Sequence, residues 1–505
     1  MNKSYSTARK ESTNKITSLL IALSFWVSCV WLQAQDTIVL SLPDAIRIGM
    51  KNSVDAAVAR NEYTSAYWEY KSYKAELLPE ISIGATLPYY SMSYNPIQNP
   101  VDGSYTYTES NFSRIDGEIS VSQLLPFTGG KLSLSGSLQR LQQYGKDGST
   151  NFMSNPFSII LEQPINGFSR ERWLRRIEPI KYKEATQKLV SENEQVAGKV
   201  IDYYFNLLVA RINHDIAVQN RNNSDKLYRI AETKREINRL SESELLQLKS
   251  SLLKAESALI NAGEMENECM LQLRSLLHYD ENKVLIPVMP EGLPDKISLL
   301  EYGEVLALAI ENHSFTQNIQ RRLLEASRDV NIAKSERWNA TLFVSYGMSG
   351  IDNSFSGAMN STNWRNDKSV NVGISVPILD WGKRKGKVSV AEANREVLQS
   401  KIEKEQIDFH QNIHILVMNF NNQPQKLSLA KENDEVAQRR YQISVDAFIL
   451  GKMDILNLND SQNSKDEARR EYINQMWLLW DYYYRIRGLT LYDFANHQPL
   501  HSIEN

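Results

Sequence analysis

Two patterns of apolar and polar residues alternate along this chain. Residues 81–87, 157–161, 342–348 and 370–376 place an apolar side chain at nearly every second position, with small or polar residues between them. This period predicts β-strands whose two faces differ. In residues 245–276 and 472–486 the period lengthens to about 3.5 residues, which predicts long helices packed side by side as coiled coils.

The alternating strands allow two interpretations. A soluble β-sandwich has strands with one apolar and one wet face, and so has the wall of a membrane β-barrel. No segment after residue 35 is long and apolar enough for a transmembrane helix. Residues 95–114 and 350–369 are rich in Asn, Ser, Gly and Asp, and are expected to be long external loops. These linkers favour the barrel wall.

Short motifs recur in the same order in the two halves of the chain. Residues 45–53 match 305–313 at an offset of 260, and Pro164-Ile165 matches Pro377-Ile378 at an offset of 213. Residues 244–246 match 454–456 at an offset of 210. The sequence therefore predicts an internal duplication, in which each copy has a helix, strands and a long helical stretch.

Composition and the N-terminus narrow the class of protein. Lys and Arg number 57 against 60 Asp and Glu, for a net charge of −3, so nucleic acid is not an expected partner. Residues 1–34 have a basic start, an apolar core and a small-residue end, which predicts a secretory signal peptide. Lipidation at Cys29 is an alternative. Cys269 is the other cysteine, and it lies on an apolar helix stripe.

Basic clusters follow two of the predicted strands. Pro377 ends one strand, and Trp381 and the basic residues of 383–387 come next; Pro164 and Phe168 stand in the same relation to 170–176. Proline cannot donate to a strand ladder, and amphipathic aromatics favour a membrane–water boundary. We expect both segments to mark strand-to-helix boundaries at a membrane surface, although a solvated helix face would also carry such charges.

Four stretches resemble the TolC-like outer-membrane efflux family. They are LPDAIRIGMKNS from Leu42, KAELLPEISIGA from Lys74, the strand ends QPINGFSR and VPILDWGKRKG, and LGKMDILNLND from Leu450. The resemblance implies an α+β membrane protein: a homotrimeric transmembrane β-barrel continued by a coiled-coil α-helical tunnel in the periplasm. It also implies location in the outer membrane, and as partners outer-membrane lipid, a periplasmic adaptor (membrane fusion protein) and an inner-membrane pump of RND or ABC type.

The expected domains follow from the repeats and this resemblance. After the signal peptide, residues 35–290 form a first repeat, with a helix, barrel strands, an extra hairpin at 117–142 and a long helix pair. Residues 291–490 form a second repeat with two barrel strands, and 491–505 form a tail. The extra hairpin would widen the trimer from 12 strands to 18, or fold over the mouth or into the lumen. Pro424 is expected to kink or break a helix.

The helix tips carry the expected gate. Gly451 marks the turn between the two long helices of the second repeat, where the first repeat has Ser241, and Asp454 is expected to cap the next helix. Family members place two acids further on as a periplasmic constriction. The matching positions here are Asn457 and Asp460, so a ring of three Asp460 carboxylates is expected.

Enzyme chemistry is not expected, and neither is a cofactor or a bound metal. His410 and His414 have a spacing at which two histidines can share a metal, but no third ligand is evident. The resemblance therefore implies a passive outer-membrane channel in a tripartite efflux or type I secretion system. The alternative is a coiled-coil envelope protein with a structural or adhesive role.

Overall fold

The computed structural model describes residues 36–98, 100–145, 148–165, 168–236, 241–280, 282–290, 292, 299–336, 339–375, 378–450 and 452–500. The expected signal peptide and Cys29 lie outside these residues. The described residues form two compact units, of which the first falls within Met1–Arg60, Val190–Ala309 and Ile413–Asn505 and the second within Asn61–Leu189 and Ile310–Asn412. Two helices of 67 residues, α4 (Arg170–Glu236) and α9 (Lys383–Ile449), contribute to both units.

The helices of the two halves follow one another in the same order, and the first half has two more sheet strands than the second. The first half runs β1 (Asp36–Leu40), α2 (Leu42–Asn52), α3 (Val54–Glu76), β2 (Glu80–Gln98), β3 (Tyr105–Leu125), β4 (Gly130–Gln143), β5 (Thr150–Pro164), α4 and α5 (Glu242–Leu277). The second runs β6 (Lys283–Pro287), α6 (Tyr302–Asn312), α7 (Ser314–Ser335), β7 (Asn339–Asp352), α8 (Phe355–Ala358), a 3₁₀ turn η1 (Ser361–Asn363), β8 (Arg365–Ser375), α9 and α10 (Ile455–Thr490). Two short strands, β9 (Tyr492–Asp493) and β10 (Gln498–Pro499), close the described chain.

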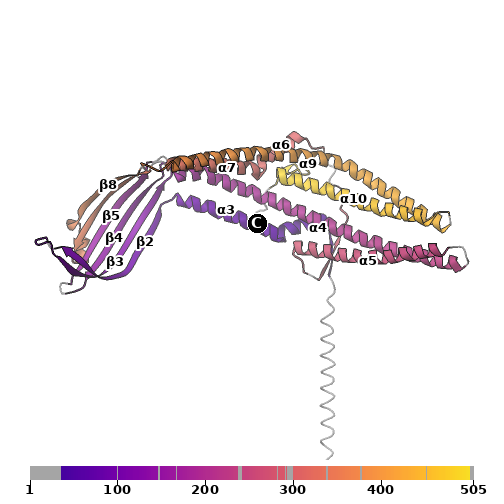
Figure 1. Cartoon of the computed structure of the whole chain (residues 1–505), viewed down its shortest axis with the longest axis horizontal. Helices are drawn as coiled ribbons and strands as arrows, with labels where there is room; N and C mark the ends of the chain where they lie inside the picture. Colours follow the sequence, from indigo (N-terminus) through magenta and orange to yellow (C-terminus); the bar gives the residue numbers. More distant parts are fainter. Residues whose placement is uncertain are drawn as a thin grey trace, which may run out of the picture. The chain divides into compact units, whose positions relative to one another are not determined.

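The second unit is built on one antiparallel sheet. Its six strands lie in the order β2-β3-β4-β5-β7-β8, so the chain adds each new strand at the same edge (Figure 1). The expected extra hairpin is the β3–β4 pair, whose register runs from Phe112 opposite Gln143 to Leu125 opposite Gly130. Both of its strands lie inside the sheet, because β4 also pairs with β5.

The strands are longer than the sequence predicts. Residues 95–114 were expected to be a loop, but β2 continues to Gln98 and β3 begins at Tyr105. The expectation was wrong because polar composition does not prevent pairing when the ladder bonds come from the backbone, and the Tyr-Thr alternation of 105–108 favours strands. The other expected loop, 350–369, is reduced to residues 353–364, which hold α8 and η1.

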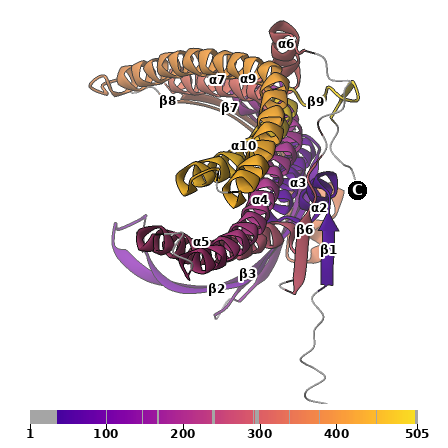
Figure 2. The same ribbon diagram turned by 90° about the vertical axis from the view of Figure 1, so that its right-hand side faces the viewer.

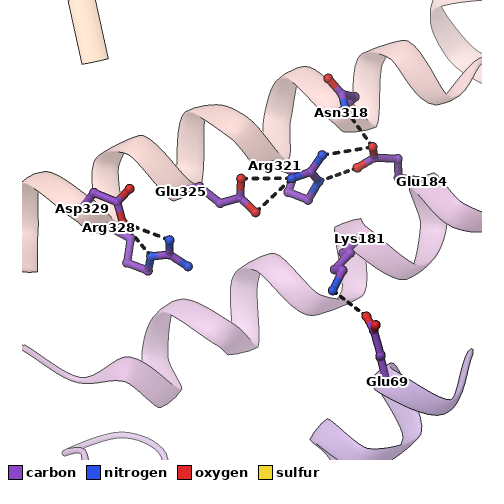
Figure 3. A network of polar contacts seen from close by, with 8 residues as sticks. All are labelled: Glu69, Lys181, Glu184, Asn318, Arg321, Glu325, Arg328 and Asp329. Atoms are coloured by element: carbon purple, nitrogen blue, oxygen red, sulfur yellow. Dashed lines mark hydrogen bonds and ion pairs between the residues drawn. The ribbon is translucent and has the colours of Figure 1, made fainter. Parts of the chain in front are cut away.

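Ion pairs hold four helices of the second unit side by side. Lys181 of α4 binds Glu69 of α3, with 2.6 Å between Nζ and Oε2 (Figure 3). The Arg321 guanidinium of α7 binds Glu184 of α4. These contacts, and that of Arg322 with Glu405 of α9, give the order α3, α4, α7, α9.

The first unit has the main apolar core. In Figure 2, the parallel pair of β1 and β6 lies beside α2. Buried side chains of these elements pack with α4, α5 and α10 around Tyr204, whose hydroxyl donates to the carbonyl of Leu40 at 2.9 Å. Burial raises the pKa of Tyr204 to about 12. Gly49 is required in α2, since a Cβ at this position would collide with Val200 of α4.

Pro424 does not break its helix. Helix α9 runs through it without interruption, although proline removes one backbone donor. Beside it, the fully buried Gln423 donates from Nε2 to the backbone carbonyl of Gln475 at 2.9 Å and to its side-chain oxygen at 2.6 Å. These hydrogen bonds join α9 to α10 beside the position where the helical bond is missing. Among the described residues, no helix is both long enough and apolar enough to cross a bilayer.

Candidate functional site

One face of the sheet is apolar across all six strands. In an antiparallel ladder, residues directly opposite one another share a face. The registers therefore place on one face a set of large apolar side chains that are exposed by 38–81%: Ile81, Ile83, Ile119, Leu132, Leu134, Ile159, Tyr346, Val370, Val372 and Ile374. We call this set the apolar face. Soluble monomers rarely expose so extended an apolar surface, so this face is suited to lipid contact.

The opposite face is mainly polar at the same level of the strands. Apart from Ile160 and Phe343, its side chains carry hydroxyl, amide or carboxylate groups: Glu80, Ser82, Ser120, Ser133, Ser135, Ser158, Ser345 and Asn371. Ser82 and Ser120 hydrogen-bond across the β2–β3 ladder at 2.8 Å. This face is suited to water.

The first expected strand-to-helix boundary lies at the end of β5. Pro164 is its last residue, as its missing donor requires, and Ile165 donates its N–H to the carbonyl of Ala340 at 2.8 Å. Phe168 is half-buried two residues before α4 begins. The exposed Phe127 occupies the β3–β4 turn, and its backbone carbonyl accepts a hydrogen bond from Arg172 of α4 at 2.9 Å.

The second boundary exposes a short apolar segment. Pro377 lies outside the described residues. Ile378, Leu379 and Trp381 are exposed by 101%, 68% and 89%, which places three large apolar side chains just before α9. Trp381 has a φ of 53°, a left-handed conformation that turns the chain into the helix. Exposed apolar and aromatic groups beside the apolar face fit a membrane–water interface.

The basic cluster after Trp381 is partly neutralised within the second unit. Lys387 binds Glu336 with 2.6 Å between Nζ and Oε2. The carboxylate of Asp380 accepts hydrogen bonds from the backbone N–H groups of Gly382 and Arg384, and it lies 4.0 Å from Nε of the Arg384 guanidinium. These contacts give two of the basic residues a structural role at the start of α9.

The two helix tips are capped by different side chains at equivalent places. Ser241 is the N-cap of α5 and forms a capping box with Glu244. Asp454 is the N-cap of α10, where its carboxylate accepts the N–H of Asn457 at 2.7 Å and an amide hydrogen of the same residue at 3.1 Å. Both helices have 36 residues. The N-caps thus correspond at the offset of 213, so the sequence match of Glu244 with Asp454, and of Ser241 with Gly451, was wrong by three residues.

The expected gate residues have different roles in the structure. Asn457 serves the N-cap of its own helix. Asp460 is exposed by 65% and binds Arg440 of α9 with 2.8 Å between Oδ2 and Nη2. Gly451 lies outside the described residues. Of the expected pair, Asp460 alone carries a charge, and its partner Arg440 could not be recognised from the sequence.

A cavity of about 370 Å³ lies between the helix tips. Apolar side chains from α4, α5, α9 and the start of α10 dominate its lining: Leu227, Ile230, Leu248, Phe448, Met453, Ile455 and Leu456. Leu456 is exposed by 71%, and the neighbouring Leu450 by 70%. The tips therefore offer apolar surface of the kind that a partner helix can cover.

Arg321 is the centre of the polar network that holds the helices of the second unit together (Figure 3). The Arg321 guanidinium lies between Glu184, at 2.7 Å, and Glu325, at 3.0 Å. Asn318 donates to the same Glu184 carboxylate at 2.8 Å. The hydrogen bond to Glu184 raises the pKa of Arg321, so this cation is charged at all physiological pH values. Its role is to fix α4 against α7.

The first unit contains a buried ion pair. Arg487 of α10 and Glu194 of α4 are 3.2 Å apart, with side chains exposed by only 15% and 4%. Burial raises the pKa of Glu194 in spite of the nearby cation. Two partners 293 positions apart give no sequence signal, and this pair was missed.

The described part of the chain holds no group of three or more His, Cys, Asp or Glu side chains that could bind a metal ion. His414 is exposed and packs edge-on against Tyr302, with 5.1 Å between ring centroids.

Comparison with known proteins identifies a matching family model and solved structures of similar fold. Residues 306–476 match the family model described as outer membrane efflux protein. The outer-membrane channel OprN is similar in fold, with 15% identity, a TM-score of 0.62 and coverage of 90% of each chain. The outer-membrane channel CmeC of Campylobacter jejuni is also similar in fold, with 15% identity, a TM-score of 0.59 and coverage of 91% of this chain and 87% of CmeC. The outer-membrane protein VceC of Vibrio cholerae has 12% identity, a TM-score of 0.61 and coverage of 91% of this chain and 96% of VceC. Curated protein sequences give no significant match. The resemblance to the TolC-like outer-membrane efflux family is confirmed.

Proposed function

We propose that this chain, which carries an outer membrane efflux protein domain on the fold of outer-membrane channels, is the passive outer-membrane channel of a tripartite efflux or type I secretion system. Its sheet lies in the outer membrane, and its long helices extend into the periplasm as a tunnel. The observation that carries the proposal is the apolar face, which runs over six hydrogen-bonded strands and has a polar face behind it.

The proposed assembly is a homotrimer of internally duplicated chains. The duplication is supported by helix lengths that match in pairs: α4 and α9 have 67 residues each, α5 and α10 have 36, and α2 and α6 have 11. An open sheet with an exposed apolar face supports the assembly, because backbone groups in lipid need partners and only a closed ring supplies them. Other copies of the chain are the proposed source of those partners.

The helix tips are the proposed docking site for the periplasmic adaptor. The cavity between them is apolar and accessible. An amphipathic adaptor helix could bury Leu450 and Leu456 there, which are otherwise exposed. The adaptor would connect the channel to an inner-membrane pump, of RND or ABC type, that supplies the energy. Neither the net charge of the chain nor its fold points to nucleic-acid binding or to enzyme activity.

Single-channel recording tests the proposal. We expect the purified full-length protein to run as a trimer in detergent and to produce discrete conductance steps in planar bilayers. A coiled-coil structural or adhesive protein would give no steps under the same conditions. The protein should also stay with outer-membrane vesicles through a high-salt wash, and release into the soluble fraction by that wash would contradict the proposed location.

A second prediction concerns the proposed gate. Three Asp460 carboxylates in the trimer would attract cations, and the pairing with Arg440 would hold α10 against α9. We expect Asp460→Ala to raise the resting conductance and to weaken cation selectivity or divalent-cation block. Arg440→Ala should also raise the conductance, but it should preserve cation selectivity because the carboxylates remain.

Glu467→Ala is the matched control for the gate. Glu467 is an exposed acid of the same helix, two turns beyond Asp460 and on the same side. Its removal should leave conductance, selectivity and block unchanged. The gate assignment is wrong if Asp460→Ala gives the same recordings as Glu467→Ala.

A further inference from the structure

We infer that the barrel wall of this channel takes six strands from each copy, so that three copies close an 18-stranded barrel. The extra β3–β4 hairpin is then a structural part of the wall and widens the pore. This inference rests on the proposed trimeric channel and goes beyond it, because a channel with four wall strands per copy would serve the same proposed function.

Continuous hydrogen bonding places the hairpin in the wall. Strand β3 pairs with β2 through Glu80–Ser122 and its neighbours, and with β4 along its other edge. Strand β4 then pairs with β5 down to Lys131–Glu162. A hairpin folded into a lumen or over a mouth would leave β2 or β5 without these neighbours. Removing the hairpin would break the sheet between β2 and β5.

The side chains of the hairpin follow the same division as the rest of the wall. Ile119 and Leu134 are exposed by 52% and 47% on the apolar face. Their neighbours in sequence, Ser120 and Ser135, pair with each other on the polar face. A hairpin immersed in a water-filled lumen would gain nothing from such alternation, whereas a membrane wall requires it. Towards the N-terminal end of β3, the polar side chains of Asn111 and Ser113 lie on the same side of the sheet as the apolar face. This end of the strand therefore lies outside the bilayer.

The two edges of the sheet fit a second copy of this chain. Within the described residues, no strand lies beyond β2 or β8. Six antiparallel strands are an even number, so β8 of one copy runs antiparallel to β2 of the next. Ile81 and Ile83 at one edge and Val370 and Val372 at the other belong to the same apolar face. Joining copies edge to edge therefore continues the lipid-facing surface without reversal.

The strand number sets the width of the barrel. With strands 4.7–4.9 Å apart and tilted by 35–45°, 18 strands give a diameter of about 35 Å between backbones, against about 24 Å for 12 strands. An α-helix with its side chains is about 10–12 Å wide. The barrel would thus admit helical or looped polypeptide as well as small molecules, and the size limit for cargo would lie at the helix tips.

Cysteine labelling of adjacent hairpin residues tests this placement in the membrane. We would compare Ile119→Cys with Ser120→Cys, and Leu134→Cys with Ser135→Cys, in proteoliposomes of the full-length protein. A charged, water-soluble maleimide should label the two former serine positions and spare the two apolar ones, which a lipid-soluble maleimide should label instead. The unmodified protein, whose described cysteine is buried, gives the background. Equal labelling of both members of each pair by the charged reagent would overturn the inference.

Direct imaging of the trimer separates this inference from the proposed function. Electron cryo-microscopy of the protein in nanodiscs should show 18 strands around the barrel. A trimeric barrel of 12 strands with the hairpin elsewhere would overturn the inference and leave the channel proposal standing. Absence of any closed barrel would overturn both.

Discussion

Ile119→Arg is expected to prevent assembly of the channel, while Ser120→Arg is expected to be tolerated. Ile119 is exposed on the apolar face, and its neighbour opposite in β4 is Gly136, which offers no shielding. A basic side chain on the lipid face of a barrel costs about 2–4 kcal/mol at mid-membrane and less near the surfaces. Because every copy carries the substitution, the trimer would lose up to about 6–12 kcal/mol.

The two variants differ by one position, so they match in charge, size and place in the chain. Ser120 lies on the polar face, where it hydrogen-bonds to Ser82 and where water can solvate an arginine. Semi-native electrophoresis of outer-membrane fractions measures the folded trimer. We expect a strong trimer band for Ser120→Arg and its loss for Ile119→Arg. Similar bands for the two variants would show that β3 does not contact lipid.

The alternation that makes this prediction possible is visible in the sequence. Ile81-Ser82-Ile83 specifies which side of β2 is apolar, because a strand can turn only every second side chain the same way. The lengths of the strands, in contrast, could not be predicted from this alternation. Residues 95–114 are rich in Asn, Ser, Gly and Asp, yet backbone pairing continues through Gln98 and resumes at Tyr105. The polar composition of this segment reflects its exposure to water and does not determine its backbone conformation.

The helix tips show a different limit of sequence comparison. Matching Glu244 to Asp454 by charge gave the wrong alignment, because the structurally equivalent residues are Ser241 and Asp454. Serine and aspartate cap a helix in the same way, with a side-chain oxygen that accepts a free N–H. Two capping residues are therefore matched by their position relative to the start of the helix. Comparing residue types along the sequence does not show that position.

Contacts between segments that are far apart in the chain could not be predicted from the sequence. The pairing of Asp460 with Arg440 joins two helices across the tip turn. Pro424 was expected to kink or break its helix; the helix is not broken, and the neighbouring Gln423 is hydrogen-bonded to Gln475 of α10. The sequence of one helix does not reveal either contact, because the partner lies on another helix.

The buried pair of Arg487 and Glu194 is expected to be the most sensitive point of the first unit. Arg487→Met removes the cation and leaves a carboxyl group that is 4% exposed. Breaking a buried ion pair by removing one partner costs about 3–5 kcal/mol. We expect a lower midpoint of thermal unfolding, followed by the helical circular dichroism signal of the protein in detergent.

The loss should depend on pH in a defined direction. Burial already raises the pKa of Glu194, and Arg487 opposes that rise. Without Arg487 the folded-state pKa rises further above the unfolded value of about 4.3, so the folded state binds the proton more tightly. Its stability is therefore retained below about pH 4.3 and is lost as the pH rises through the folded-state pKa. The deficit of Arg487→Met should be larger at pH 8 than at pH 5.

A double variant separates the lost ion pair from lost packing. Arg487→Met combined with Glu194→Gln removes both charges and keeps side chains of similar size. Replacing both members of a buried pair is often nearly neutral, so we expect the double variant to recover most of the lost stability and the pH dependence that comes from Glu194 to disappear. Asp493, 3.7 Å from Arg487, also loses this cation in both variants but keeps its hydrogen bonds from Tyr483 and Asn496. If Arg487→Met and the double variant unfold at the same temperature at pH 8, the stranded carboxylate is not the cause. The stability would then come from the packing of Arg487 over the ring of Tyr484, which lies 4.7 Å from the guanidinium.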